Sequence, residues 1–223
     1  MNVDRGYIPR HGLPAGAWAA LEGSFTAMVA GGLPCGAALT DSSGVVIVRG
    51  RNHAYDPGDG SDVLEGTPLA HAEMNVLAQV HTTRDLSHDT LWSTQQPCAM
   101  CAASLSFCGV GQVRFLAADP AFVASDDARG GKPFDPTDEN PQWTVWAILA
   151  NALFLQPAIL RGDTARLNRN RSVEPETVEA ALRLSATPRT DDLASLVDSI
   201  WDMLVPLAEQ RCDRLIRQPK PRR

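Results

Sequence analysis

Two stretches decide the fold and the chemistry of this chain: Leu69-Ala70-His71-Ala72-Glu73 and Gln96-Pro97-Cys98-Ala99-Met100-Cys101-Ala102. Together they read His-x-Glu followed by Pro-Cys-x-x-Cys. A catalytic zinc takes three nitrogen or sulfur ligands from the protein and keeps a fourth position for water. One imidazole and two thiolates supply that number. We therefore predict that His71, Cys98 and Cys101 hold one Zn2+ per chain.

The spacing of these residues supports the assignment. Residues three apart on a helix share a face, so the sulfurs of Cys98 and Cys101 can reach one metal. A helix N-terminus also lowers thiol pKa values and favours thiolates, and Pro97 fits just before a first helical turn. Glu73 lies two residues beyond His71, which places the two side chains on different faces. We expect Glu73 to reach the metal's water without ligating and to act as the catalytic proton shuttle.

The same motifs carry a resemblance to a known family. In these two stretches, in Pro34-Cys35-Gly36-Ala37-Ala38-Leu39 and in Gly50-Arg51-Asn52, the chain resembles the cytidine/deoxycytidylate deaminase superfamily. Within it, the chain is most similar to the zinc-dependent nucleobase and nucleoside deaminase branch, which holds guanine deaminases and tRNA adenosine deaminases. The resemblance covers about residues 20 to 120. It implies a three-layer α/β/α sandwich with a central mixed sheet of about five strands.

The resemblance also implies substrate contacts. An asparagine at the position of Asn52 contacts the base or sugar in similar proteins, since an amide both donates and accepts hydrogen bonds; the alternative is a simple turn asparagine. Backbone groups around Ala72 and Cys98 would orient the exocyclic amino group. Outside the resembling region, Trp143 could stack on a base as an aromatic side chain, although aromatic residues at helical spacing more often belong to a core. Gln96 departs from the glutamate common in close relatives, which leaves the substrate open.

Hydrophobic periodicity predicts the elements that position these motifs. Strands are expected at 35–40, 45–49, 91–94 and 112–117, and helices at 15–30, 71–82 and 98–107. This alternation favours an α/β sheet flanked by helices, with ligands at the strand ends. The acidic segment 53–68 is a long loop, either a wall of the pocket or a solvated insertion.

The C-terminal part is expected to be helical. Residues 126–141 are rich in Gly, Pro and Asp and predict a loop, and residues 142–156 predict an apolar helix. We assign residues 1–156 to the zinc catalytic domain and 157–223 to a C-terminal helical extension with a disordered basic tail. The apolar stripe of an amphipathic helix at 191–215 must bury against the core or a second subunit, and we expect a homodimer.

Composition limits the partners. The 223 residues are 44% hydrophobic and 21% charged, which is typical of a soluble globular protein, and we expect no apolar run of membrane-spanning length. The chain has 20 Lys and Arg and 26 Asp and Glu, and the resulting net charge of −6 argues against a nucleic-acid partner. An odd count of five cysteines favours free thiols in a reducing cytoplasm.

These patterns favour one function over two alternatives. The favoured function is a zinc-dependent hydrolytic deaminase that converts an amino-substituted nucleobase, nucleoside or similar small heterocycle to its oxo form and releases ammonia. A tRNA adenosine-to-inosine deaminase would share the motifs but should carry a basic groove. A non-catalytic, zinc-stabilised interaction module would need a fourth protein ligand and would leave Glu73 without a role.

Overall fold

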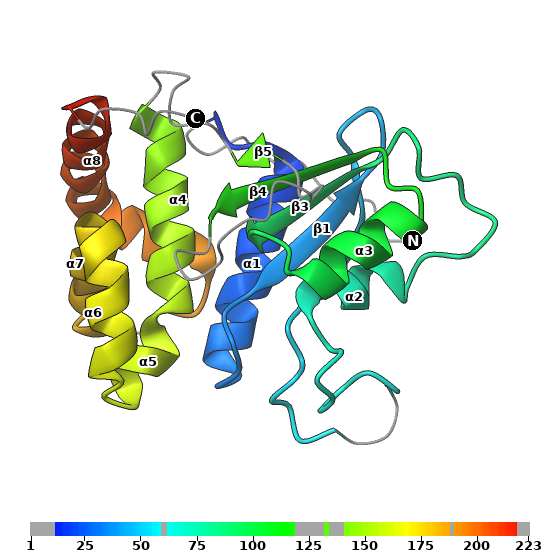
Figure 1. Cartoon of the computed structure of the whole chain (residues 1–223), viewed down its shortest axis with the longest axis horizontal. Coiled ribbons are helices and arrows are strands. Elements are labelled where there is room, and N and C mark those ends of the chain that lie inside the picture. The colour runs from blue at the N-terminus through cyan, green and yellow to red at the C-terminus, as the bar shows by residue number, and fades with distance from the viewer. Residues whose placement is uncertain (1–11, 59–61, 119–131, 134–140, 188–189, 218–223) are drawn as a thin grey trace.

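The computed structural model describes residues 12–58, 62–118, 132–133, 141–187 and 190–217 (Figure 1). The elements in the N-terminal half are α1 (Ala15–Val29), β1 (Gly36–Thr40), β2 (Val46–Arg51), α2 (Ala72–Leu77), β3 (Thr90–Gln95), α3 (Ala99–Phe107), β4 (Gln112–Ala117) and β5 (Lys132–Pro133). Five described helices follow: α4 (Pro141–Phe154), α5 (Gln156–Leu160), α6 (Thr164–Val173), α7 (Pro175–Ser185) and α8 (Leu193–Arg217).

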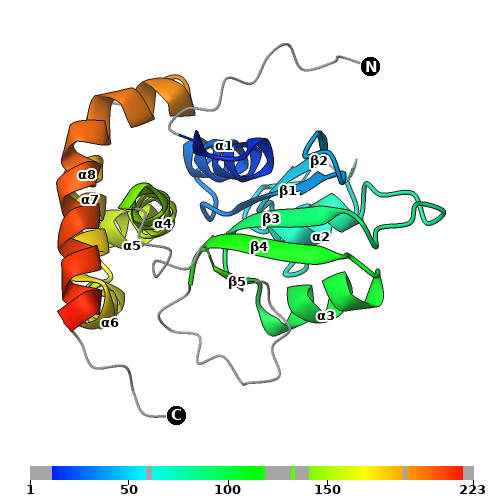
Figure 2. The same ribbon diagram turned by 90° about the horizontal axis from the view of Figure 1, so that it is seen from above.

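One mixed sheet organises the molecule, in the strand order β2-β1-β3-β4-β5. Strand β1 runs antiparallel to both β2 and β3, whereas β3, β4 and β5 are parallel. Figure 2 shows α2 and α3 on one face of this sheet and α1 on the other. The predicted three-layer α/β/α sandwich with a mixed sheet of about five strands is confirmed.

Two glycines allow the helices to lie close to the sheet. A Cβ on Gly36 would come within 2.0 Å of the backbone oxygen of Ala20, so only glycine lets α1 lie directly on β1. A Cβ on Gly50 would lie 2.7 Å from the carbonyl oxygen of Ala72 on the opposite face. The second contact brings the first turn of α2 onto β2, and this turn follows the predicted ligand His71.

The C-terminal helices extend the core on the α1 side of the sheet. Helix α4 packs against α1 and β4 on one side and against α7 and α8 on the other (Figure 1). Trp146 of α4 lies 6.1 Å from Trp18 in an edge-to-face arrangement and 5.4 Å from Trp201, measured between ring centroids. The apolar stripe of α8 is therefore buried within its own chain. The same core contains residues on both sides of position 156, so the proposed domain boundary there stays a prediction.

Several boundaries differ from the sequence predictions. Helix α2 ends at Leu77 instead of continuing to residue 82, because the N–H groups of Gln79 and Val80 bond three residues back and the β-branched Thr82 and Thr83 follow. The expected loop at 126–141 contains the short strand β5 and ends where α4 begins at Pro141, whereas residues 126–131, 134–140 and the predicted tail 218–223 lie outside the described residues.

The expectation that no apolar run reaches membrane-spanning length needs correction. Trp143–Leu160 is long and apolar enough to cross a membrane by length and composition alone. However, 67% of this window is buried inside the structure, and its residues pack between α1, α7 and α8. The run is apolar because protein surrounds it on several sides. Such a composition is typical of a helix in the centre of a core.

Candidate zinc and catalytic site

The three predicted ligands meet where two helices begin. His71 immediately precedes α2 and Cys98 immediately precedes α3, and each has an extended backbone at the helix N-terminus. Cys101 lies in the first turn of α3 and is fully buried. The three distances between His71 Nδ1, Cys98 Sγ and Cys101 Sγ are all 3.6 Å. The structure therefore brings together all three residues chosen from the sequence.

This triangle has the dimensions of a zinc site. Tetrahedral coordination with ordinary Zn–S and Zn–N bond lengths places two sulfurs about 3.8 Å apart and a sulfur and a nitrogen about 3.6 Å apart. Burial, with the neighbouring Glu73 and Cys98, raises the pKa of the Cys101 thiol. Because sulfur ligates zinc as a thiolate, metal binding would release this proton. The cluster can hold one zinc ion.

No fourth protein ligand completes the site within the described part of the chain. Among the residues that the structure describes, no further His, Cys, Asp or Glu ligand atom lies within 4.8 Å of all three members of the triangle. Structural zinc sites usually have four protein ligands, whereas catalytic sites have three and an open position. The donor set therefore fits a catalytic zinc better than a structural one.

Glu73 lies beside the triangle and is only 6% exposed. Its Oε2 is 3.5 Å from Cys101 Sγ, and its Oε1 accepts a hydrogen bond from Ser93 Oγ at 3.0 Å. The bond from Ser93 fixes one carboxylate oxygen and thereby orients the other. Sequence reasoning did not identify Ser93. Strand alternation could have placed it on the α2 face, but its pairing with Glu73 depends on tertiary structure.

Asn52 lies at the end of β2, close in the fold to His71. Its side-chain Oδ1 accepts a hydrogen bond from the N–H of Ala54 at 3.0 Å, and its own N–H donates to Cys35 O. The next residue, His53, donates its N–H to the carbonyl of Ala70. These bonds give Asn52 the turn-forming role that was the alternative explanation. Its contact with substrate stays a prediction.

The other residues predicted to contact the substrate are Ala72, Cys98 and Trp143, and they lie in different parts of the fold. Ala72 is buried in the first turn of α2, and Cys98 immediately precedes the first turn of α3. In the first turn of a helix the backbone N–H groups have no partner within the helix. Trp143 is partly buried and packs against the core formed by α1, α4 and α8. This packing matches the core alternative for Trp143, so its stacking role receives no support from the structure.

The acidic loop is tied to the end of β2. Arg51 forms two hydrogen bonds with the carboxylate of Asp56, at 3.2 and 2.5 Å, and this guanidinium holds the pKa of that carboxyl below its ordinary value. Ligand atoms of His53, Asp56 and Glu65 also lie within 4.8 Å of one another. Because Arg51 already engages both oxygens of Asp56, we interpret this group as an anchor for the loop.

The fold and the site define an α/β zinc-binding protein with a buried carboxylate beside three metal ligands. Residues 19–117 match the family model described as the cytidine and deoxycytidylate deaminase zinc-binding region. By this match, residues 19–117 are similar to the zinc-binding region of the cytidine deaminase superfamily. The predicted resemblance is confirmed, and all of the site residues discussed above except Trp143 lie inside the matched region.

The solved structures to which this chain is similar include three from work on deaminases. A structure from a study of tRNA:A34 deaminases has 28% identity and a TM-score of 0.38, over 51% of this chain and 72% of the other. Guanine deaminase from Bacillus subtilis has 23% identity and a TM-score of 0.39, over 46% and 62%. The dCMP deaminase of cyanophage S-TIM5 has 22% identity and a TM-score of 0.30, over 42% and 78%.

These similarities to solved structures do not identify the substrate of this protein. All three TM-scores are below 0.5, and the chain covers less than two thirds of the guanine deaminase. No curated protein matches the chain.

Proposed function

We propose that this protein is a zinc-dependent hydrolytic deaminase of a small amino-substituted heterocycle, such as a nucleobase or nucleoside. The observation that carries the proposal is the position of Glu73. Its carboxylate is buried, is oriented by Ser93 and contacts the ligand triangle without belonging to it. A structural zinc site has no need for such a group, whereas hydrolysis of an aminated ring needs a proton carrier.

The chain's residues can move the required protons. Zinc in the triangle would supply a Lewis acid that lowers the pKa of a water molecule to about 7. Glu73 accepts a proton as the water oxygen bonds to the amino-bearing ring carbon, and it delivers that proton to the adjacent ring nitrogen. The second water proton reaches the exocyclic nitrogen through Glu73. The C–N bond then breaks, ammonia leaves, and the ring retains an oxo group.

Charge favours a small substrate over RNA. The net charge of −6 gives no general attraction for a phosphate backbone. Near the site, the loop after Asn52 carries Asp56, Asp62 and Glu65, and the Arg51 cation is already paired with Asp56. A polyanion approaching this loop would meet like charge. We therefore propose a small-molecule substrate and not tRNA.

The test is ammonia release by zinc-loaded protein from guanine, adenine, cytosine, their nucleosides, aminated pterins and triazines, and unmodified tRNA. Glu73→Gln keeps the shape and can still accept the bond from Ser93, so it should retain zinc and stability while losing at least about 1000-fold in kcat. The matched control Glu65→Gln changes a carboxylate outside the triangle and should retain activity. Turnover of tRNA alone, or equal activity of wild type and Glu73→Gln, would contradict the proposal.

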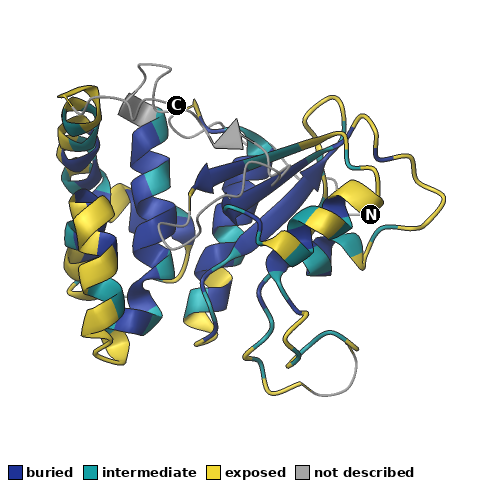
Figure 3. Ribbon diagram, viewed as in Figure 1, coloured by how far each residue is buried: buried dark blue, intermediate teal, exposed yellow. Residues whose placement is uncertain are grey.

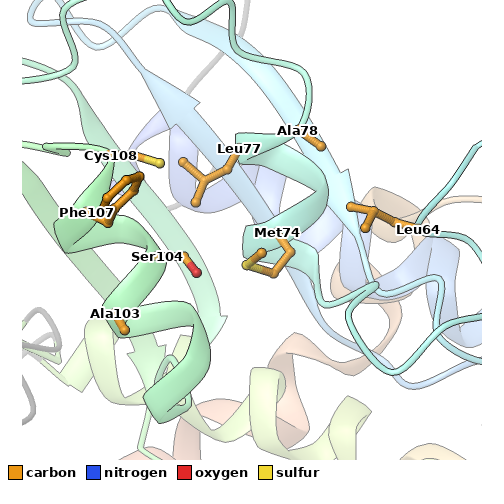
Figure 4. Close-up of a pocket in the computed structure, with 8 residues that line it drawn as sticks. All are labelled: Leu64, Met74, Leu77, Ala78, Ala103, Ser104, Phe107 and Cys108. Atoms are coloured by element: carbon orange, nitrogen blue, oxygen red, sulfur yellow. The ribbon is translucent and has the colours of Figure 1, made fainter.

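We further propose that the protein is a cytoplasmic homodimer. All five cysteines are free, as a reducing compartment allows. With the stripe of α8 covered by its own chain, we place the second copy on the apolar groove between α2 and α3. Figure 4 shows Met74 and Leu77 of α2 facing Phe107 of α3 across it, and Phe107 is 92% exposed. Exposed apolar patches of this kind mark interaction sites.

Light scattering on a size-exclusion column would test this assembly. Phe107→Glu should convert the dimer to a monomer because it places a charge in the apolar groove. Leu160→Glu changes a residue that is 79% exposed at the end of α5, far from this groove in the fold, and should leave the dimer intact. A wild-type monomer would contradict the proposal.

A further inference from the structure

Gln95, the last residue of β3, is a buried amide whose hydrogen-bonding capacity the protein does not use. The residue is 7% exposed. Within the described part of the chain, neither Oε1 nor Nε2 of its side chain has a hydrogen-bond partner. Buried polar groups are nearly always paired, since leaving one unpaired costs as much as a lost hydrogen bond. An amide with both atoms unpaired therefore requires an explanation.

The strand directs this amide toward the candidate site. Side chains alternate along β3: Trp92 packs on the α1 side of the sheet, whereas Leu91 packs with the residues of α2 and α3. Ser93 shares the face of Leu91 and donates to Glu73. Gln95 is the next residue on that face, about 7 Å further along the strand. It thus lies beyond the proton carrier, toward the turn that leads to Cys98.

The backbone around Gln95 is firmly held. Gln95 pairs with Ala117 of the parallel strand β4, and the N–H of Gln96 donates to the carbonyl of Ala117 at 2.8 Å. The carboxyl ends of parallel strands are where α/β sheets bind their ligands. The paired backbone fixes the point from which the side chain of Gln95 projects, and its burial keeps the amide away from bulk water.

We propose that Gln95 is a substrate-specificity residue whose amide pairs with a lactam edge, a ring N–H next to a ring carbonyl. A primary amide presents one donor and one acceptor in a plane, which matches such an edge with two hydrogen bonds. This proposal rests on the proposed deaminase function and narrows its substrate class. The preferred ring carries a lactam in addition to the amino-bearing carbon that reacts, as guanine and cytosine do.

Two pairs of probes isolate this interaction. Guanine has the lactam and 2-aminopurine lacks it. In the same way, cytosine has the lactam and 4-aminopyrimidine lacks it. Calorimetry would measure their dissociation constants for zinc-loaded Glu73→Gln, which cannot turn them over, and for the double variant Glu73→Gln/Gln95→Leu. In at least one pair, the compound with the lactam should bind Glu73→Gln about tenfold more tightly than the compound without it. Gln95→Leu should abolish this difference, whereas Gln112→Leu, at the opposite end of β4, should preserve it.

Thermal unfolding separates recognition from a structural role. Because Gln95→Leu replaces an unpaired buried amide by an apolar group, its melting temperature should equal or exceed that of the wild type. A lower melting temperature, a preference for the lactam that survives Gln95→Leu, or failure of all four probes to bind would overturn the proposal. Ammonia release is measured separately on the wild type. Gln95-dependent binding without release would refute the deaminase function while leaving the role of Gln95 intact.

Discussion

The two faces of the sheet are built for different purposes. On one face, α1 and the C-terminal helices bury a large apolar core around Trp146, which we name the helical core. On the other face, a small cluster, named here the site core, consists of seven buried residues: Ala37, Leu39, Ala72, Val76, Leu86, Leu91 and Leu105. Figure 3 shows α4 dark blue over most of its length, while α3 is largely teal and yellow.

The difference between the two faces separates the residues that stabilise the fold from those of the candidate zinc site. The helical core contains large aromatic and branched side chains but none of the predicted metal ligands. The face with the site core carries the three ligands, Glu73 and Ser93, and its helices α2 and α3 are short. Polar and unpaired groups such as Gln95 can be retained there because the other face supplies most of the apolar burial. We expect perturbations of the two faces to separate stability from activity.

Zinc removal should have the largest effect, and only on the site face. Dialysis against a chelator should abolish ammonia release from the small-heterocycle substrate, because no described residue replaces the metal's Lewis acid. Equimolar zinc should restore it. Far-ultraviolet circular dichroism should retain most of its helical signal, since the helical core needs no metal. Loss of that signal along with the metal would show that the two faces are not independent.

Truncation of the helical core should have the opposite outcome. Trp146 is 1% exposed and packs between Trp18 and Trp201, so Trp146→Ala should lower the free energy of unfolding by about 3–5 kcal/mol. Urea titration would measure this loss, and kcat of the folded fraction should change little. Trp143→Ala is the matched control with a smaller expected loss of stability. A rise in KM for Trp143→Ala would instead support the stacking role predicted from the sequence.

An ion pair joins α7 to α8 within the helical layer and should make stability depend on pH. Arg214 forms two hydrogen bonds with Glu176, at 2.8 and 2.9 Å. Burial alone would raise the pKa of Glu176, but the bonds from Arg214 outweigh it and the net shift is downward. Arg214→Met leaves a buried carboxylate unpaired and should lower the free energy of unfolding by about 3 kcal/mol at pH 7.

The pH dependence follows from the direction of this shift. A carboxyl with a lowered folded-state pKa stabilises the protein above its unfolded pKa of about 4.3, and this contribution is lost as the pH falls through the folded value. The difference between wild type and Arg214→Met should therefore start to shrink as the pH falls through the raised pKa that burial gives Glu176 in the variant, and it should stop changing once the wild-type carboxyl is protonated as well. Arg217→Met removes the exposed pair with Asp213 and should be nearly neutral at every pH. A pH-independent difference would refute this account of the ion pair.

The smallest effect is expected from the bond that orients the proton carrier. Ser93→Ala removes the hydrogen bond to Glu73 Oε1 and should reduce kcat by about fivefold, which corresponds to about 1 kcal/mol, while KM changes little. Steady-state kinetics on the substrate identified by ammonia release would measure it. Ser104→Ala is the control, because this α3 hydroxyl bonds to the carbonyl of Met100 and not to Glu73. An unchanged kcat would show that Glu73 is positioned without Ser93.

Much of the fold and of the metal site was predictable from the sequence. Helix α1 and strand β4 lie where periodicity placed them, because one buried face imposes its repeat on the sequence. The ligands were predictable because zinc demands particular atoms and a helical spacing between the two cysteines. The end of α2 and the strand β5 were not predicted, since both depend on bonds and pairing outside the local pattern.

The sequence by itself predicted His71, Cys98 and Cys101 as zinc ligands and Glu73 as the proton carrier, and the structure brings these four side chains together. Only the tertiary structure decided that Ser93 holds Glu73, that Gln95 is buried unpaired beyond it, and that the stripe of α8 packs on its own chain. The physical reason is the distance along the chain over which each interaction acts. Ligand spacing and helical period act within a few residues, whereas these contacts join segments whose proximity is set by strand register and by the packing of α4 between two layers.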